Sequence, residues 1–488
     1  MFNFNIFNIK DSAKTSMTRL EFFEAEIKKF KNSQKRKDMF TGENYYGGEH
    51  DILNRKRTII GEDGLLVEVT NLPNNKILDN QYAKMVDQKT NYLLGKPIAF
   101  KTDNVSYAAQ LEVIFSKKFQ RTLKNLGESS FNGGIAYLYP YYNDNGDIAF
   151  KIFYPYEGIP FWKDQEHTDI DCFIRIYKVE AYEGAREVVV EKAEIYSTEG
   201  IERYTLKDNK LILDVENPSS THFKVEVEGK ESGLNWERVP VVAFKYNNKE
   251  IPLIKRVKCL QDGINIIISD FENNMQEDAR NTILVLKNYD GTDLGEFRRN
   301  LATYGVVKVR YDGEAKGGVE TLTVEVNSEN YKAILDIFKK ALIENARGYD
   351  AKDERMNNNP NQMNIQSMYS DIDLDANGME TEWQASFEEL LWFINVHLTN
   401  TGKGDFTNEK VDIIFNRDVL INETEAITNC KDSVGVISNE TIVSQHPWVN
   451  DNEEELKRLK EEKQDEINDI YKQSLTDTLG GGIGDQEE

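Results

Sequence analysis

The chain has 488 residues and carries 84 acidic against 60 basic side chains, a formal net charge of −24 at pH 7. Single hydrophobic cores stop growing well below this length, so about two to four domains are expected. A protein that holds nucleic acid statically needs Lys and Arg to displace phosphate counterions, so the charge argues against a static DNA-binding protein. It does not exclude a protein past which DNA slides, because an acidic surface repels phosphate. Ordinary solubility charge is the plainer alternative.

The cysteines and the apolar runs indicate the kind of cellular compartment in which the protein is made. Cys172, Cys259 and Cys430 are too widely separated for a disulfide framework or a zinc site, which favours a reducing environment. No apolar run approaches the ~20 residues of a membrane span, and the first ten residues lack the basic and apolar regions of a signal peptide. We therefore expect a soluble protein made in a cytoplasm.

The first part of the chain reads as helices followed by strands. Periodic apolar residues predict helices over 15–39, 73–96 and 109–127, with Gly95 ending the second. From 134 to 246, short alternating segments separated by turn residues are typical of β-sheet, so the fold class is α+β. The expected strands are IAYLYPYY, IAFKIFYP, CFIRIYKVE, EVVVEKAEIYS, LILDVE, FKVEVEG and VPVVAFKY.

Two amphipathic helices, 251–276 and 328–347, flank a β-rich insert at 277–327. The first spans about 25 residues, or roughly 37 Å, which suits a strut in an assembly better than the wall of a catalytic pocket. The insert holds the segments ILVLKNY, GVVKVRY and VETLTVEV around a short helix near 294–301. Steps of three and four place on one face Ile254, Val257, Leu260, Ile264, Ile268, Phe271 and Met275 of the first helix, and Tyr331, Ile334, Leu335, Phe338 and Leu342 of the second.

Beyond the second helix the chain alternates between polar and helical segments. The loop 348–363 is polar and contains Pro360, so it is expected to be mobile. A long helix at 364–400, a strand within 411–415 and an acidic helical region at 423–471 follow, and the glycine-rich tail is expected to be flexible.

Candidate catalytic and metal-binding residues are few. Asp371, Asp373 and Asp375 are spaced like the first ligands of a calcium loop, with Glu382 at its twelfth position. Ala376 stands where that loop needs glycine, so a polar break or kink in a long helix is the preferred interpretation. The histidines show no ligand spacing, and neither GEDG nor FNGG is followed by the GK[ST] of a phosphate loop. We therefore predict a protein that is not an enzyme and has no metal or cofactor.

Five segments between Asn75 and Glu462 resemble, in their order and extent, those of a known protein family. They are NKILDNQYAKMVDQKTNYLLGKPIAF, FNGGIAYLYPYYNDNGDIAFKIFYPYEGIPFW, IPLIKRVKCLQDGINIIISDFENNMQEDARNTILVLKNYDG, MNIQSMYSDIDLDANGMETEWQASFEELLWF and VGVISNETIVSQHPWVNDNEEELKRLKEE. In these segments the chain resembles the portal proteins of tailed bacteriophages, specifically those of long-tailed phages of Gram-positive hosts.

The resemblance implies a multidomain portal fold and a closed ring of copies, commonly about twelve and with thirteen possible in isolation. Double-stranded DNA would be packaged and ejected through the ring at one capsid vertex. The implied parts are a mixed α/β wing at 1–250 joined by the long helix 364–400, stem helices at 251–276 and 328–347, a β-rich clip at 277–327, a tunnel loop at 348–363, and a helical crown with its tail at 401–488.

The resemblance also implies roles for particular residues. In the tunnel loop, weak sliding contacts with DNA would come from Tyr349, Asp350, Lys352, Asp353, Glu354, Arg355, Asn357, Asn358 and Asn359. Stem packing between copies would use Ile254, Val257, Ile264, Ile268, Phe271, Tyr331, Leu335, Phe338 and Leu342. Contacts of the clip with terminase and then with a head-completion adaptor would use Asn288, Tyr289, Asp290, Phe297, Arg298, Arg299, Lys308 and Arg310.

Partners and location follow from the same resemblance. Besides terminase and the adaptor, the wing would contact major capsid and scaffolding proteins, and no membrane is involved. The protein would reside in the virion at the portal vertex, after assembly in the host cytoplasm. Two other functions stay open: a carboxylate- or metal-dependent nuclease or hydrolase using Asp371, Asp373 and Asp375, and a structural or adhesion protein that forms no portal.

Overall fold

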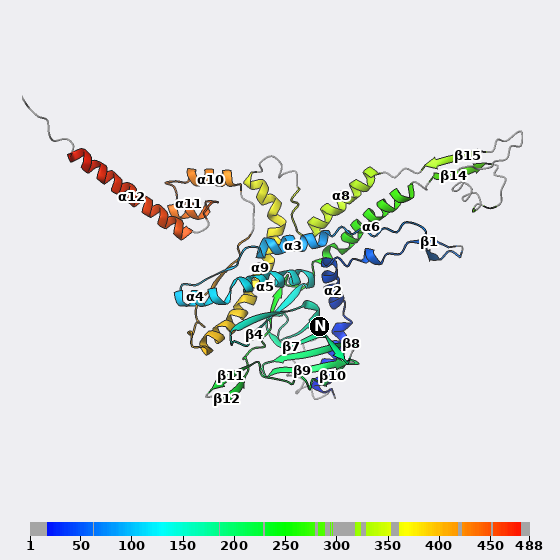
Figure 1. The fold of residues 1–488 in the computed structure, drawn as a ribbon, viewed down its shortest axis with the longest axis horizontal. Helices are drawn as coiled ribbons and strands as arrows, with labels where there is room; N and C mark the ends of the chain where they lie inside the picture. The colour runs from blue at the N-terminus through cyan, green and yellow to red at the C-terminus, as the bar shows by residue number, and fades with distance from the viewer. Residues whose placement is uncertain are drawn as a thin grey trace, which may run out of the picture. The chain divides into compact units, whose positions relative to one another are not determined.

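The computed structural model describes residues 17–61, 63–184, 186–227, 230–278, 282–287, 293, 295, 318–323, 328–352, 361–417, 422–449 and 452–479. Helices and antiparallel sheets are mixed along the chain, which confirms the α+β class (Figure 1). The chain forms two compact units. The first comprises Met1–Gly348 and Ile372–Asp418, and the second comprises Tyr349–Asp371 and Val419–Glu488.

The N-terminal helical region is two helices, α1 (Arg19–Lys31) and α2 (Gln34–Tyr46). The prediction of one helix over 15–39 is therefore wrong. The Ser33 Oγ accepts a hydrogen bond from the backbone N–H of Arg36, and Ser33 itself has extended backbone angles. Because a serine in this position caps the start of a helix, it ends the first helical segment and begins the next.

Three more helices precede the sheets: α3 (Gln81–Leu94), α4 (Val105–Ile114) and α5 (Lys117–Gly133). α3 ends before Gly95 as predicted, but it begins later than predicted because Asn80 caps it by accepting a hydrogen bond from the Ala83 N–H. The predicted helix over 109–127 is split in two at Phe115 and Ser116, where Phe115 leaves the helical backbone region (φ −83°, ψ 40°).

Antiparallel strands form two main sheets in the first unit, with strand orders β13-β4-β5 and β10-β9-β8-β7-β6. All seven predicted strand segments contain a strand, whereas β6, β9 and β12 were not predicted. The strands are β4 (Ile135–Tyr142), β5 (Ile148–Phe153), β6 (Gly158–Trp162), β7 (Ile170–Glu183), β8 (Arg186–Ser197), β9 (Gly200–Lys207), β10 (Lys210–Leu213), β11 (Phe223–Val227), β12 (Lys230–Leu234) and β13 (Val242–Lys245). The 3-10 turns η2 (Asp51–Asn54) and η3 (Pro155–Glu157) complete this part.

Short strand pairs also lie outside these two sheets, and one of them is β11 with β12. β3 (Ala99–Lys101) pairs antiparallel with β16 (Asp412–Ile414), which confirms the predicted strand within 411–415. β1 (Thr58–Ile60) and β2 (Leu66–Glu68) form a hairpin that the sequence analysis did not predict.

The apolar core joins the helices to the sheets. Phe23 and Ile27 of α1 pack with strand residues such as Ile195 of the five-stranded sheet. On the three-stranded sheet, the Phe244 ring of β13 meets the fully buried Trp383 ring at 4.9 Å between centroids. The sheets thus hold the N-terminal helices and the part of the long helix α9 (Gln362–Asn400) that follows Asp371 in one body.

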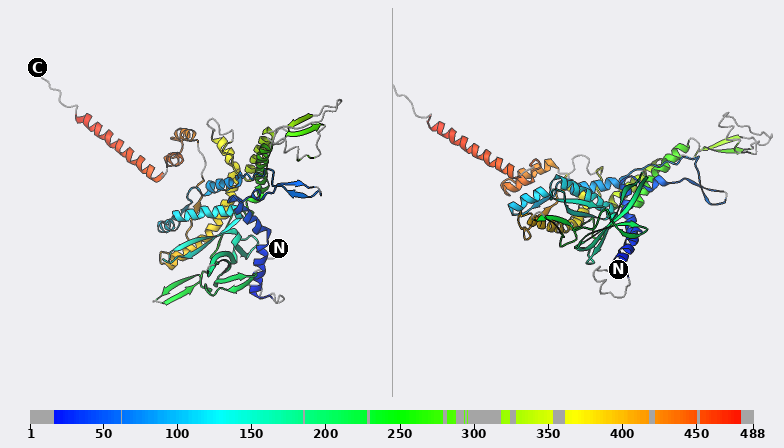
Figure 2. Two further views of the ribbon diagram at one scale, coloured as in Figure 1. Left: turned by 45° about the vertical axis from the view of Figure 1, so that its right-hand side comes forward. Right: turned by 60° about the horizontal axis from the view of Figure 1, so that its bottom comes forward.

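A pair of helices carries the strand insert. α6 (Ile254–Asp278) and α8 (Ser328–Asn345) run side by side and lead to β14 (Thr282–Lys287) and β15 (Gly318–Thr323), as Figures 1 and 2 show. β14 and β15 pair antiparallel in register from Thr282 with Thr323 to Lys287 with Gly318. This confirms two of the predicted insert strands; the third, and all of the short helix near 294–301 except residue 295, lie outside the described residues.

The helix α9 (Gln362–Asn400) is helical over its whole length, so the acidic triplet at Asp371–Asp375 does not break it. The acidic C-terminal region is helical as predicted, divided into α10 (Glu423–Asp432), α11 (Asn439–Gln445) and α12 (Asn452–Leu479).

Candidate functional site

α6 and α8 pack against each other within one subunit. Gly263 faces the ring of Phe338 so closely that a Cβ on it would lie 2.5 Å from the ring. Farther along, the rings of Phe271 and Tyr331 meet at 5.2 Å between centroids, and the Tyr331 hydroxyl accepts a hydrogen bond from Asn274 Nδ2 at 2.8 Å. The predicted apolar faces therefore hold the two helices together.

Burial divides the predicted stem residues into two groups. Ile254, Val257, Ile264 and Leu342 are at most 1% exposed inside the subunit. Partly exposed side chains belong to Ile268, Phe271, Tyr331, Leu335 and Phe338. Packing of these residues between copies stays a prediction. A charge introduced at the first group would unfold the subunit itself, so it would not test assembly.

The opposite side of α6 carries a polar ladder, defined as four side chains four residues apart and at most 2% exposed: Gln261, Asn265, Ser269 and Asn273. The ladder faces an extended segment, residues 75–79, which we call the strap. Each contact joins a ladder side chain to the strap backbone: Asn273 Oδ1 accepts from the Asn75 N–H (2.7 Å), Ser269 Oγ from the Ile77 N–H (2.9 Å), and Asn265 Oδ1 from the Asp79 N–H (3.1 Å).

Gln261, at the end of the ladder, both donates and accepts a hydrogen bond with backbone groups. Its Nε2 donates to the Asp79 carbonyl at 2.8 Å, and its Oε1 accepts from the Tyr82 N–H at 2.9 Å. Four residues of helix rise about 6.0 Å and two residues of extended chain about 6.6 Å. The spacings match closely enough for every second strap residue to meet every fourth residue of α6, which sets the register of α6 on the body.

At the base of the helix pair, Asp375 of α9 is surrounded by cations. Its carboxylate lies 2.9 Å from Lys89 Nζ, 3.1 Å from Arg256 and 3.5 Å from Arg347, and it accepts a hydrogen bond from the Tyr246 hydroxyl at 2.7 Å. Lys89 also donates to the Arg347 carbonyl at 2.9 Å, just beyond the end of α8. One carboxylate therefore links α3, α6, the end of α8 and α9.

Burial and charge oppose each other in this cluster. Burial lowers the pKa of Lys89 to about 8, although the negative charge of Asp375 acts to raise it. For Asp375, burial acts to raise the pKa, but the charge of Lys89 and the hydrogen bonds from Tyr246 and Lys89 hold that pKa below its usual value. The cluster stabilises the fold only while Asp375 keeps its cations and Lys89 keeps the carboxylate of Asp375.

A second acid of the triplet, Asp373, is also held by ion pairing and hydrogen bonding. Asp373 binds Arg417 at 2.8 Å and accepts a hydrogen bond from the Tyr92 hydroxyl, and Arg417 binds Glu380 at 2.7 Å. Two of the three acids that the hydrolase alternative would use, Asp373 and Asp375, therefore lie on a continuous helix and are held in ion pairs. Within the described ranges no group of three or more His, Cys, Asp and Glu is arranged to hold a metal ion.

The tunnel loop is described only at its two ends. Tyr349 lies against the ring of Tyr369 at 4.5 Å between centroids, and the backbone N–H of Lys352 donates to Asp350 Oδ1 at 3.0 Å. The other predicted loop residues lie outside the described residues: Asp353, Glu354, Arg355, Asn357, Asn358 and Asn359. Their contact with DNA stays a prediction.

The predicted clip contacts also lie outside the described residues. They are Asn288, Tyr289, Asp290, Phe297, Arg298, Arg299, Lys308 and Arg310. The pairing of β14 with β15 gives them a base, but their roles stay predictions.

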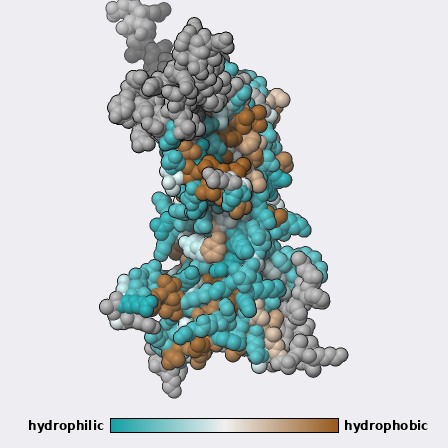
Figure 3. All heavy atoms as spheres, turned by 90° about the vertical axis from the view of Figure 1, so that its right-hand side faces the viewer, coloured by the Kyte–Doolittle hydropathy of each residue, from teal (hydrophilic) through white to brown (hydrophobic). Residues whose placement is uncertain are grey.

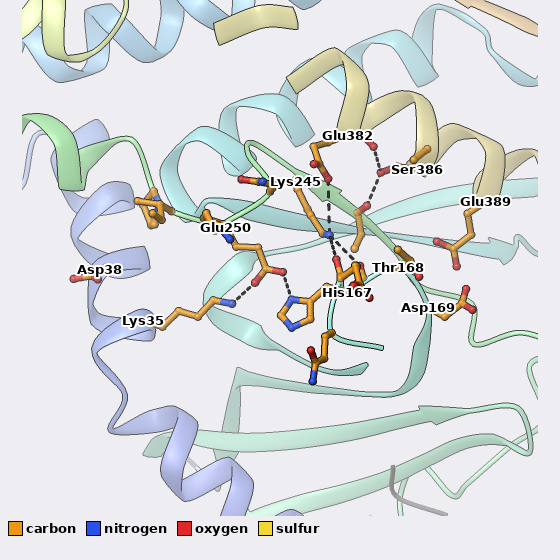
Figure 4. Close-up of a pocket in the computed structure, with 18 of the residues that line it drawn as sticks. Lys35, Asp38, His167, Thr168, Asp169, Lys245, Glu250, Glu382, Ser386 and Glu389 are labelled. Carbon is orange, nitrogen blue, oxygen red and sulfur yellow. Dashed lines mark hydrogen bonds and ion pairs between the residues drawn. The ribbon is translucent and has the colours of Figure 1, made fainter. Parts of the chain in front are cut away.

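A charged cleft of about 1130 Å³ opens between α2, the loop 163–169, β13 and α9 (Figure 4). Glu250 is the most deeply buried acid there, and it binds both Lys35 and His167 Nδ1, the latter at 2.6 Å. Burial alone would raise the pKa of Glu250, but the hydrogen bond from His167 and the charge of Lys35 lower it to about 2. Lys245 Nζ donates to the His167 carbonyl at 2.9 Å, which fixes the loop.

Glu389 lines the same cleft beside Asp169 (Figure 4). Burial and the negative charge of Asp169 raise the pKa of Glu389 to about 7, against the pull of Arg238 and Lys163. Its folded pKa lies above the unfolded value of 4.5, so its contribution to stability is present below pH 4.5 and lost as the pH rises through 7.

Replacing Glu389 with glutamine is therefore expected to raise the free energy of unfolding by about 1–2 kcal/mol at pH 8 and to change it little at pH 4.5. Denaturant unfolding at both pH values measures the difference. Glu388→Gln, at an exposed neighbour, is the matched control and should show no such pH-dependent gain. An equal effect of Glu389→Gln at both pH values would contradict the argument.

Sequence reasoning missed two features that adjoin the helix pair, of which the polar ladder positions it. The signal for the polar ladder was the spacing of four residues between Gln261, Asn265, Ser269 and Asn273. A search for apolar periodicity does not detect this polar pattern. The hairpin of β1 and β2 was signalled by TII and LLVE on either side of GEDG. Both signals are polar or turn patterns rather than apolar stripes.

These elements define a class: a structural subunit in which a strand-tipped helix pair is fixed in register on an α+β body. Residues 26–469 match the family described as "Phage portal protein, SPP1 Gp6-like". The chain is 30% identical over 442 residues to the portal protein of Bacillus phage SPP1, covering 89% of this chain and 86% of that protein. It is 26% identical over 444 residues to the portal protein of Clostridium phage phiCD119, covering 88% and 94%.

The chain therefore belongs to the SPP1 Gp6-like family of phage portal proteins, and the resemblance stated from the sequence is confirmed. No helix in the described part of the chain is both long and apolar enough to span a membrane.

Proposed function

We propose that copies of this chain close into a ring at one vertex of a phage capsid, and that double-stranded DNA is packaged and ejected through the axial channel of the ring. The observation that carries the proposal is the family match over 26–469, which includes both helices of the stem. We define the stem as α6 and α8. The number of subunits is proposed to be about twelve, as is common in closed rings of this family.

The charge of the chain supports a channel that lets DNA slide. Twelve copies bring about −288 formal charges into one particle (12 × −24). Acidic groups that face the bore would repel phosphate, so DNA would meet weak contacts rather than a clamp. Lys352 is exposed at the start of the tunnel loop, where the acids that follow in the sequence offset its charge.

The partners are assigned by part. We propose that the clip, 277–327, binds terminase during packaging and a head-completion adaptor afterwards. The wing, 1–250 with the helix at 364–400, would contact major capsid and scaffolding proteins, and 401–488 would form the crown. The ring would assemble in the host cytoplasm and remain in the virion.

Deleting 353–360 from the tunnel loop is expected to leave rings intact and to block DNA packaging. The reason is that the deletion spares the stem and both described ends of the loop. Negative-stain electron microscopy measures ring formation, and protection of DNA from nuclease in a packaging reaction measures packaging. Deleting 480–488 of the tail is the control and should preserve both. Normal packaging by the loop deletion would refute the loop's role, whereas failure of the intact chain to form any ring would refute the proposed function.

A further inference from the structure

The hairpin of β1 and β2 carries an apolar surface that its own subunit does not cover. Every residue of both strands is exposed. The apolar side chains are between 48% and 74% exposed: Ile59, Ile60, Leu65, Leu66 and Val67. On the side toward which the hairpin projects, hydrophobic side chains gather in several areas of a mostly hydrophilic surface (Figure 3). An isolated two-stranded hairpin is marginal in water, so these strands need a covering partner.

The base of the hairpin is fastened to the stem. Arg55 binds Asp270 of α6 at 2.9 Å, and the Arg55 carbonyl accepts a hydrogen bond from Asn74 Nδ2 at 3.1 Å. Lys76 Nζ donates to the Leu53 carbonyl at 2.6 Å, which ties the start of the hairpin to the strap. The hairpin is thus presented at a fixed level of α6 rather than on a free tether.

α8 carries a second apolar stripe, which is exposed and lies beside the one that contacts α6. Ile334 and Ile337 are 45% and 62% exposed, and Ala341 continues the stripe at the next helical step. Tyr331 and Phe338 of the same helix already serve the contact with α6. Two stripes on one helix indicate two partners, one inside the subunit and one outside it.

We propose that the β1–β2 hairpin of one subunit packs on the Ile334–Ile337 face of α8 in the neighbouring subunit. The inference rests on the proposed ring. In a head-to-tail ring each subunit offers two different patches, one to each neighbour, and this subunit exposes two such apolar patches. Charge is complementary as well, because Asp63 is exposed in the hairpin turn and Lys340 is exposed one step beyond Ile337. A patch of roughly a few hundred Å² is too small for a stable free dimer but suits a contact repeated around a closed ring.

The cross-linking test uses the full chain with the exposed native thiol removed by Cys259→Ser, because Cys172 and Cys430 are buried. The double variant Ile60→Cys and Ile337→Cys, treated with a short thiol cross-linker, should give a ladder of oligomers up to the closed ring. Either single variant alone should give no cross-link, and the two single variants co-expressed should stop at dimers. Val105→Cys with Ile337→Cys is the control, since Val105 is 83% exposed on α4.

The outcomes separate the hairpin contact from the ring itself. Rings in micrographs without a cross-linked ladder overturn the hairpin contact and leave the ring standing. A cross-link from Ile60→Cys alone also overturns it, because that result shows two hairpins meeting each other. If the unsubstituted chain forms no ring, the proposed function itself is overturned.

A second measurement does not depend on cysteine chemistry. Leu66→Asp should weaken each interface about tenfold to a hundredfold, the effect of exposing one buried leucine, while leaving the subunit folded. Mass photometry across a dilution series measures assembly, and circular dichroism confirms folding. Val105→Asp is the matched control and should assemble normally. Normal assembly of Leu66→Asp would overturn the proposal. If the variant assembles normally but loses binding to another phage protein, the hairpin serves that partner instead.

Discussion

Asp375→Asn is expected to lower the free energy of unfolding by about 3–5 kcal/mol, the usual cost of leaving a buried charge without its partner. The side chain of Lys89 is only 2% exposed, and Asp375 is the carboxylate that neutralises it. Asparagine keeps the shape but removes the negative charge shared by Lys89, Arg256 and Arg347. Denaturant unfolding near neutral pH measures the loss.

The pH dependence of that loss identifies its cause. Without Asp375 the pKa of Lys89 falls further below its unfolded value of 10.5, so the folded chain binds fewer protons than the unfolded chain. The deficit should therefore shrink as the pH rises toward 10. Adding Lys89→Met should recover part of the loss. Asp371→Asn, one turn earlier and exposed, is the control and should change stability by less than about 0.5 kcal/mol. A loss that does not vary with pH would point to packing instead of charge.

Gln261→Leu is expected to cost about 1–3 kcal/mol, because it leaves one buried backbone N–H without a partner. This group is the Tyr82 N–H at the start of α3, while the Asp79 carbonyl in the strap loses one of two donors and keeps the Gln81 N–H at 2.9 Å. Leucine has a similar volume, so the loss comes from hydrogen bonding rather than from a cavity. Thermal unfolding measures the cost, and hydrogen exchange should show faster exchange of the Tyr82 amide.

Gln276→Leu on the same helix is the matched control for the ladder. Gln276 is exposed, and among the described residues its hydrogen bond is to Glu272 within α6, so its loss should be within about 0.5 kcal/mol. Equal costs at the two positions would show that the ladder does not stabilise the fold.

The stem was predictable because its apolar period is long. The predicted helices 251–276 and 328–347 correspond to Ile254–Asp278 and Ser328–Asn345. Shorter helices were misjudged where a single residue decides a boundary. Ser33 and Asn80 begin new helices through side-chain caps, and such a residue also occurs in ordinary helix interiors.

The site was less predictable than the fold for a tertiary reason. Asp375 was seen as one of three acids in a row, but its role depends on Lys89 and Arg256, which are far away in sequence. The strap offers no pattern of its own, because backbone groups bond to α6 whatever the side chains are. Only the fourth-residue spacing on α6 could have revealed it.

The polar ladder restricts how the stem can move. The hydrogen bonds repeat at a fixed spacing, so sliding α6 along the strap by a fraction of that spacing would misalign all of them together. The next favourable alignment lies four residues away, about 6 Å. Small axial displacements are therefore resisted collectively. α6 and the strap should shift as one rigid piece, so any axial motion within the stem is left to the segments beyond the last hydrogen bond of the ladder.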